Sequence, residues 1–213
     1  MSFLTDLVLI LTILLSVFAL ATARIGMTIR TFALQSLLLG FLPILLHGTV
    51  GLHELLLLGG SIGIKVVLIP RLLFRTIRDV AIRRDVAPVI GYGSSLFAGA
   101  CLVALAFAIS ANLPLPTGVA SALLLPASLS TLLLGLLLLI SRTKAVTQVV
   151  GYLLVENGIF LFGMSLVQEM PLLVETGILL DVFVGVFVMG ITIFRINREF
   201  DHMDTHNLTS LRD

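Results

Sequence analysis

The chain has 213 residues, of which 58% are hydrophobic and 12% are charged, and its mean hydropathy is +1.16. These values exclude a soluble globular protein and are typical of an integral membrane protein. The apolar runs are long and do not alternate with polar residues, so we expect an all-α helical bundle and not a barrel. The single cysteine, Cys101, excludes an internal disulfide and a cysteine-held iron–sulfur cluster in this chain.

Seven apolar runs are long enough to be transmembrane helices, because about 20 helical residues span the hydrocarbon core. We expect the helices at Phe3 to Ala23, Thr28 to Leu46, His53 to Phe74, Val89 to Ala111, Gly118 to Ile140, Thr147 to Val167 and Pro171 to Arg195. Three of these runs contain an internal proline, at Pro43, Pro70 and Pro126, and we expect each proline to kink or end its helix.

Basic residues gather in alternate loops of this seven-helix arrangement. Twelve of the 13 Lys and Arg side chains fall on one side: Arg24, Arg30, Arg71, Arg75, Arg78, Arg83, Arg84, Arg142, Lys144, Arg195, Arg198 and Arg212. Since basic loops stay in the cytoplasm, we expect a multi-pass protein of a prokaryotic inner membrane with its N-terminus outside and its C-terminus cytoplasmic. The run from Arg71 to Arg84 is a topology signal or a site for anionic lipid or a docking partner.

Three charged residues lie near the middle of predicted helices, namely Lys65, Glu156 and Asp181. A charge at the centre of a membrane helix costs on the order of 2.5 to 3.5 kcal/mol, so it usually has a function. The common depth permits contact, and we expect these side chains to face the bundle or a partner subunit. Pairing an ammonium with carboxylates restores much of the lost solvation.

Two interpretations of the three charges are open. They act as a proton relay, or they cross-link helices as buried ion pairs that fix the register of the bundle. Two carboxylates and one ammonium leave an excess negative charge that protonation would neutralise, which favours the relay for Glu156 and Asp181. Tyr152 and Asn157 are possible supporting groups, because they share or adjoin the Glu156 face.

Glu54 and Glu175 lie near the starts of predicted helices, where the helix dipole favours a carboxylate. The simpler interpretation is therefore capping, and the alternative is that either residue admits or releases protons. No phosphate-binding loop, nucleophile elbow or dinucleotide motif is present, so we expect no catalytic site and no cofactor within the chain.

The second half resembles hydrogenase-4 component E, the membrane subunit of group 4 [NiFe]-hydrogenases and formate hydrogenlyases. The similarity is carried by the basic loop at 141–144, by Gly-Tyr-Leu-Leu-Val-Glu-Asn-Gly at 151–158 and by Glu-Thr-Gly-Ile-Leu-Leu-Asp at 175–181. The segment around Lys65 and the tail Asn-Leu-Thr-Ser-Leu-Arg at 207–212 look like the corresponding parts of that family.

The last three predicted helices are also similar to the small K subunit of respiratory complex I, which carries two membrane glutamates on a proton path. Glu156 matches the first by its place after a basic loop. Asp181 stands where the second is expected, but it is an aspartate and its spacing from Glu156 is shorter. We therefore divide the chain into a four-helix region at 1–117, a complex-I-K-like region at 118–196 and a cytoplasmic tail at 197–213.

The resemblance implies a membrane subunit that contributes to proton translocation and anchoring. Antiporter-like and complex-I-H-like membrane subunits, peripheral [NiFe]-hydrogenase and iron–sulfur subunits and the lipid bilayer are the expected partners, with no nucleic acid. Nickel–iron and iron–sulfur centres would lie in those partner subunits. The alternatives are a subunit of a cation/proton antiporter complex and a purely structural anchor.

Overall fold

The computed structural model describes residues 2–47, 59–60, 62–79, 90–113 and 121–166. They form α1 (Ser2–Ala21), α2 (Ile25–His47), the π-helical segment η1 (Gly63–Leu68), α4 (Ile69–Asp79), α5 (Tyr92–Asn112), α6 (Leu124–Ser141) and α7 (Ala145–Leu166). The described residues contain no strand, which confirms the all-α fold. Five helices, α1, α2, α5, α6 and α7, are long and apolar enough to cross a membrane. The seventh predicted helix lies outside the described residues.

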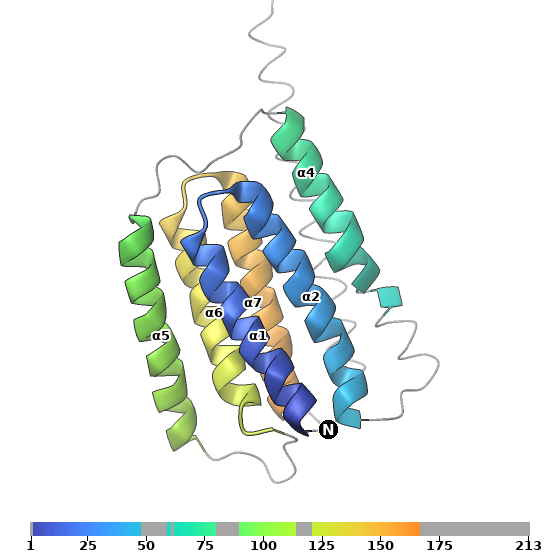
Figure 1. Ribbon diagram of the computed structural model, residues 1–213, viewed down its shortest axis with the longest axis vertical. Coiled ribbons are helices and arrows are strands. Elements are labelled where there is room, and N and C mark those ends of the chain that lie inside the picture. The colour runs from blue at the N-terminus through green and yellow to red at the C-terminus, as the bar shows by residue number, and fades with distance from the viewer. Residues whose placement is uncertain (1, 48–58, 61, 80–89, 114–120, 167–213) are drawn as a thin grey trace, which may run out of the picture.

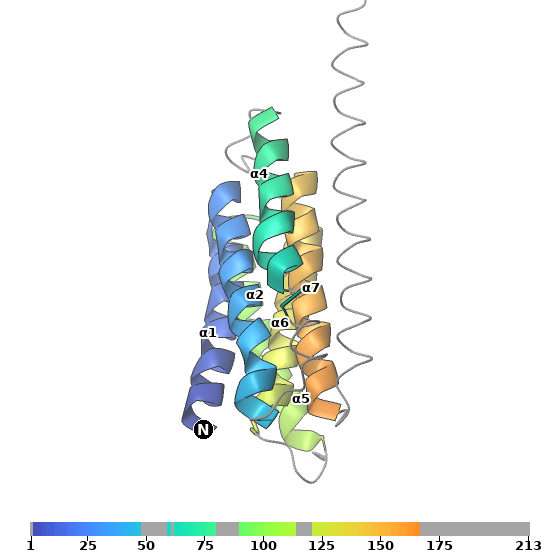
Figure 2. The ribbon, with the colours of Figure 1, turned by 90° about the vertical axis from the view of Figure 1, so that its right-hand side faces the viewer.

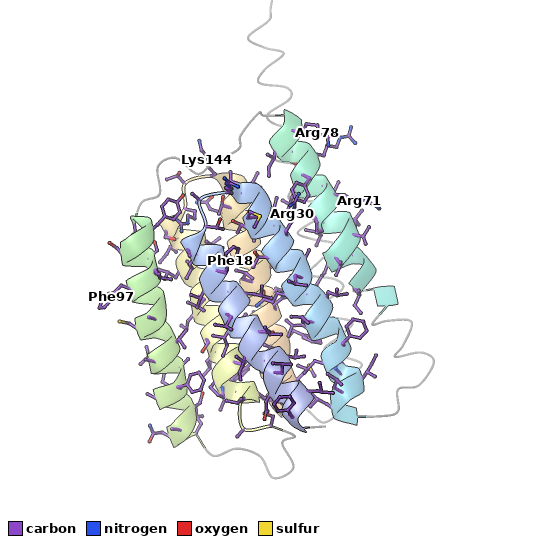
Figure 3. All side chains as sticks on the ribbon, viewed as in Figure 1. Phe18, Arg30, Arg71, Arg78, Phe97 and Lys144 are labelled. Atoms are coloured by element: carbon purple, nitrogen blue, oxygen red, sulfur yellow. The ribbon has the colours of Figure 1, made fainter. Side chains whose placement is uncertain are left out.

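Helices α1, α2, α6 and α7 form the centre of the bundle, with α5 on one side and α4 on the other (Figure 1). Three-residue turns join α1 to α2 and α6 to α7, so each pair is an antiparallel hairpin. The last turn of α4 extends past the neighbouring helix ends (Figure 2). Exposed apolar side chains such as Phe97 cover the outside of α5, as expected for a surface that faces lipid (Figure 3).

Helices α6 and α7 approach each other closely because glycines line their contact. A Cβ atom on Gly158 would lie 2.6 Å from the backbone nitrogen of Leu132, and one on Gly135 would lie 2.6 Å from that of Val155. Small residues allow membrane helices to pack backbone against backbone, where van der Waals contact replaces the hydrophobic effect. This contact holds α7 in one rotation about its axis and thereby sets the direction of every other side chain on it.

The third predicted helix differs from the prediction. We expected it to end at Phe74, but α4 continues to Asp79, and it is preceded by the wider π-helical segment Gly63–Leu68. Pro70 explains the widening, since it has no N–H to donate and its ring would clash with the carbonyl four residues earlier in a regular α-helix. Pro43 lies inside α2, which continues to His47.

Candidate functional site

A buried ion pair lies inside the bundle, between η1 and α7. The Nζ atom of Lys65 is 2.7 Å from Oε1 of Glu156. Lys65 is 8% exposed and Glu156 is 3% exposed, so water has little access to either charge. Two of the three residues predicted to share a depth in the membrane, Lys65 and Glu156, are therefore in direct contact.

The π-helical segment gives Lys65 its position. Lys65 points into the bundle, whereas Gly63 and Val67, two residues to either side, are exposed. π-Helical turns are rare, and where they occur inside α-helices they are frequently found at functional sites. Pro70 therefore has a local consequence, because the widened segment that precedes it contains the lysine.

Glu156 lies on the side of α7 away from the glycine contact with α6. At about 100° per residue, Glu156 is rotated by about 140° from Gly151, whose Cβ position faces the backbone of Leu139 at 2.7 Å. The close packing of α6 therefore turns the carboxylate toward η1. Its second oxygen, Oε2, is buried and accepts no hydrogen bond from the part of the chain that the structure describes.

Asn157 extends the site to α2. Its Oδ1 accepts from Lys65 Nζ at 3.4 Å, and its Nδ2 donates to Ser36 Oγ at 3.1 Å and to Gln35 Oε1 at 3.4 Å. Asn157 is 1% exposed and Gln35 is fully buried. Gln35 Nε2 in turn donates to Ser16 Oγ at 2.9 Å and to the carbonyl of Thr12 at 3.2 Å. A continuous set of buried polar groups thus joins the ion pair to α1.

A second buried cation, Arg142, lies in the turn between α6 and α7. Its exposed fraction is 1%, its Nη2 donates to the carbonyl of Leu20 and its guanidinium lies 4.3 Å from the centre of the Tyr92 ring. The turn therefore contacts the end of α1 and the start of α5. We had interpreted Arg142 as an ordinary loop charge, but its side chain is enclosed by protein.

Other basic side chains lie at the same end of the bundle. Arg30, Arg78 and Lys144 occur toward the end where α1 meets α2 and α6 meets α7 (Figure 3). Arg30 also lies 6.0 Å from the ring centre of Phe74, which links α2 to α4. This arrangement agrees with the clustering of basic loops on one side, while the direction of that side across the membrane stays a prediction.

Sequence comparison identifies relatives along almost the whole chain. The chain is 31% identical to hydrogenase-4 component E of Escherichia coli K12 over 205 residues, which cover 95% of this chain and 94% of that protein. The chain belongs to the hydrogenase-4 component E family. A component E of Shigella flexneri matches to the same extent, and an uncharacterised protein of Mycobacterium tuberculosis is 32% identical over 188 residues, 87% of this chain and 85% of that one. No family model and no solved structure matches.

The residues predicted for the site of this component E homologue fall into three groups. Lys65, Glu156 and Asn157 meet in the bundle. Tyr152, one turn before Glu156, is half-buried and packs against the apolar cluster that surrounds Leu20 and Leu153. The remaining predicted residues, Glu54, Glu175 and Asp181, lie outside the described residues.

The neutral members of the network in this component E homologue were not predicted from the sequence. Gln35, Ser36, Ser16 and Thr12 carry no charge and occur in apolar runs, where serine and threonine commonly bond to their own helix. Among them, Gln35 was the residue most recognisable from the sequence, because an amide in a membrane helix needs a hydrogen-bond partner on another helix.

Proposed function

We propose that this chain is a membrane subunit of a hydrogenase complex and that Lys65 and Glu156 form part of a proton path through it. Membership of the component E family supports the complex. The relay is supported by one observation above all, the contact of a buried ammonium and a buried carboxylate at 2.7 Å within an apolar bundle.

A contribution to stability alone does not explain why Lys65 and Glu156 are buried in the bundle as an ion pair. Moving two charges out of water costs several kcal/mol per ion, and apolar residues of similar size often serve stability as well or better. Ionisable groups inside membrane helices are rare, and those that occur usually mark ion or proton pathways. The Lys65–Glu156 pair is therefore better explained by proton movement than by helix attachment alone.

The geometry supports a simple sequence of steps. Oε1 of Glu156 faces the ammonium, whereas Oε2 is not engaged by the described side chains and is the atom that would take up a proton. Forming that O–H bond neutralises the carboxylate and weakens its attraction for Lys65. When the proton leaves for the next acceptor, the carboxylate is restored and the ion pair re-forms.

Asp181 is the expected next acceptor, by its predicted depth in the seventh helix and by the resemblance to the complex I K subunit. Other membrane subunits would continue the path, and electrons would run through nickel–iron and iron–sulfur centres in peripheral subunits. In this proposal the chain itself carries no cofactor, its basic loops are cytoplasmic and its N-terminus is outside.

Replacing Glu156 by Gln tests the relay. The amide keeps the shape but cannot take up a proton, so we expect hydrogen turnover by the complex to continue while protons moved per hydrogen molecule fall at least about tenfold, as for loss of a positioned acid–base group. The measurement uses inverted membrane vesicles with a pH-sensitive dye and a hydrogen electrode.

Asp6→Asn is the matched control. Asp6 is an acid on a different helix, α1, and its Oδ1 accepts from Ser121 Oγ at 2.6 Å, a bond that the amide oxygen of the variant can still accept. It should leave the ratio unchanged. An unchanged ratio in Glu156→Gln would instead support the structural anchor. Co-purification with antiporter subunits and without nickel would indicate the cation/proton antiporter alternative.

A further inference from the structure

The buried polar groups between α1 and Lys65 have a defined direction of hydrogen bonding. Thr12 Oγ1 donates to the carbonyl of Val8 at 2.8 Å, and Ser16 Oγ donates to the carbonyl of Thr12 at 3.0 Å. Because Ser16 uses its only proton in this way, its oxygen can only accept from Gln35. The end of the network at α1 thus presents acceptors alone.

Those acceptors fix the orientation of both amides. The Gln35 NH₂ group must face Ser16 and the Thr12 carbonyl, so Gln35 Oε1 faces Asn157. The Asn157 NH₂ group then faces Gln35 Oε1 and Ser36 Oγ, and its Oδ1 faces Lys65. A flipped amide at either residue would oppose donor to donor inside the protein, which is costly where no water can compensate.

Glu156 and Asn157 thus offer Lys65 acceptors of different kinds. Glu156 Oε1, at 2.7 Å, is an acceptor whose charge changes when the carboxyl takes up a proton. Asn157 Oδ1, at 3.4 Å, is neutral and has no protonation equilibrium in the range of cellular pH. Both come from consecutive residues of α7, so a small movement of the lysine side chain exchanges one for the other.

We propose that Asn157 is a positioning residue, oriented by Gln35 and Ser36, that holds the Lys65 ammonium while Glu156 carries a proton. This inference rests on the proposed relay and assigns to α1 and α2 a role in it. In each cycle the Lys65 ammonium keeps its three protons and changes its stronger acceptor from Glu156 to Asn157. The lysine is thereby kept in place for the return of the carboxylate.

The test is a double-mutant cycle between Gln35→Met and Glu156→Gln in the intact complex. Methionine matches the shape of glutamine but removes the bonds that orient Asn157. Glu156→Gln imitates the neutral carboxyl, so in that background Lys65 depends more on Asn157. The readout is the midpoint of thermal unfolding of the detergent-solubilised complex.

We expect the downward shift caused by Gln35→Met to be about twice as large beside Glu156→Gln as in the wild type, a non-additivity typical of contacting groups. Equal shifts in the two backgrounds would overturn the positioning role. Gln35→Met should also lower protons moved per hydrogen molecule about threefold, the effect of a misoriented hydrogen-bond partner.

Gln148→Met is the matched control. Gln148 lies on α7, the helix of Glu156 and Asn157, but it donates to the carbonyl of Arg142 at 2.9 Å, outside the network. The shift in the thermal midpoint caused by Gln148→Met should therefore be the same in both backgrounds. If Gln35→Met does not assemble, Ser36→Ala removes the other Asn157 acceptor with less disturbance and should show the same non-additivity. The shifts in thermal midpoint do not depend on proton movement. An unaltered proton ratio in Glu156→Gln would therefore contradict the relay, whereas equal midpoint shifts would contradict the positioning role of Asn157.

Discussion

Lys65 and Arg142 are both cations enclosed by the bundle, but they are stabilised in different ways. Lys65 lies within a helix and contacts a carboxylate and an amide oxygen. Arg142 lies in a turn and contacts a backbone carbonyl and an aromatic ring. The first site contains a partner that can gain and lose a proton. At the second site the Leu20 carbonyl and the Tyr92 ring are uncharged, and the contacts of Arg142 with them join the end of α1 to the start of α5.

Removing the lysine should have the largest effect, because it leaves Glu156 buried without its partner. We expect Lys65→Met to reduce the free energy of unfolding by about 3 to 5 kcal/mol. The yield and thermal midpoint of the complex in detergent would measure this. The double change Lys65→Met with Glu156→Gln should recover most of the loss, whereas Lys144→Met, in a loop, should have almost no effect. Equal losses in the single and double variants would show that the pair is not coupled.

Replacing the arginine should have a smaller effect, since the carbonyl of Leu20, which accepts a hydrogen bond from Arg142, carries no charge. We expect Arg142→Met to cost about 2 to 3 kcal/mol, because the buried Leu20 carbonyl loses a charged donor. The thermal midpoint should fall while protons moved per hydrogen molecule stay unchanged in the complexes that assemble. A lower proton ratio at normal stability would contradict the division between the two cations.

The aromatic contact should have the smallest effect of the three. Tyr92→Leu removes the ring beneath the Arg142 guanidinium, and we expect a loss of about 1 to 2 kcal/mol. Tyr92→Phe keeps the ring and should retain most of that stability. In an Arg142→Met background, Tyr92→Leu should cost less than in the wild type, which a comparison of thermal midpoints would detect.

The same two cations show what could be predicted from the sequence. Lys65 and Glu156 were recognisable because a charge inside a long apolar run needs a partner at its own depth. Arg142 was not, because a basic residue in a loop is normally exposed and nothing in its neighbours indicates that Leu20 and Tyr92 enclose it. The π-helical segment had one signal, Pro70, which predicts a disturbed helix but not the kind of disturbance.

Within the described residues, the helix order and most helix bounds followed from hydrophobicity, because each helix must satisfy its own backbone in the membrane. The hydrogen bonds of Gln35 and Asn157 did not, since they depend on the rotation of α2 and α7. The rotation of α7 results from close packing against α6 at Gly135, Gly151 and Gly158.

The most direct test of the relay is infrared difference spectroscopy of the complex in membranes during hydrogen turnover. We predict a carboxyl C=O band that changes in intensity on turnover and is absent in Glu156→Gln, with the band intact in Asp6→Asn. A spectrum with no band that depends on Glu156, recorded from a complex that moves protons, would contradict the claim that this carboxylate carries them.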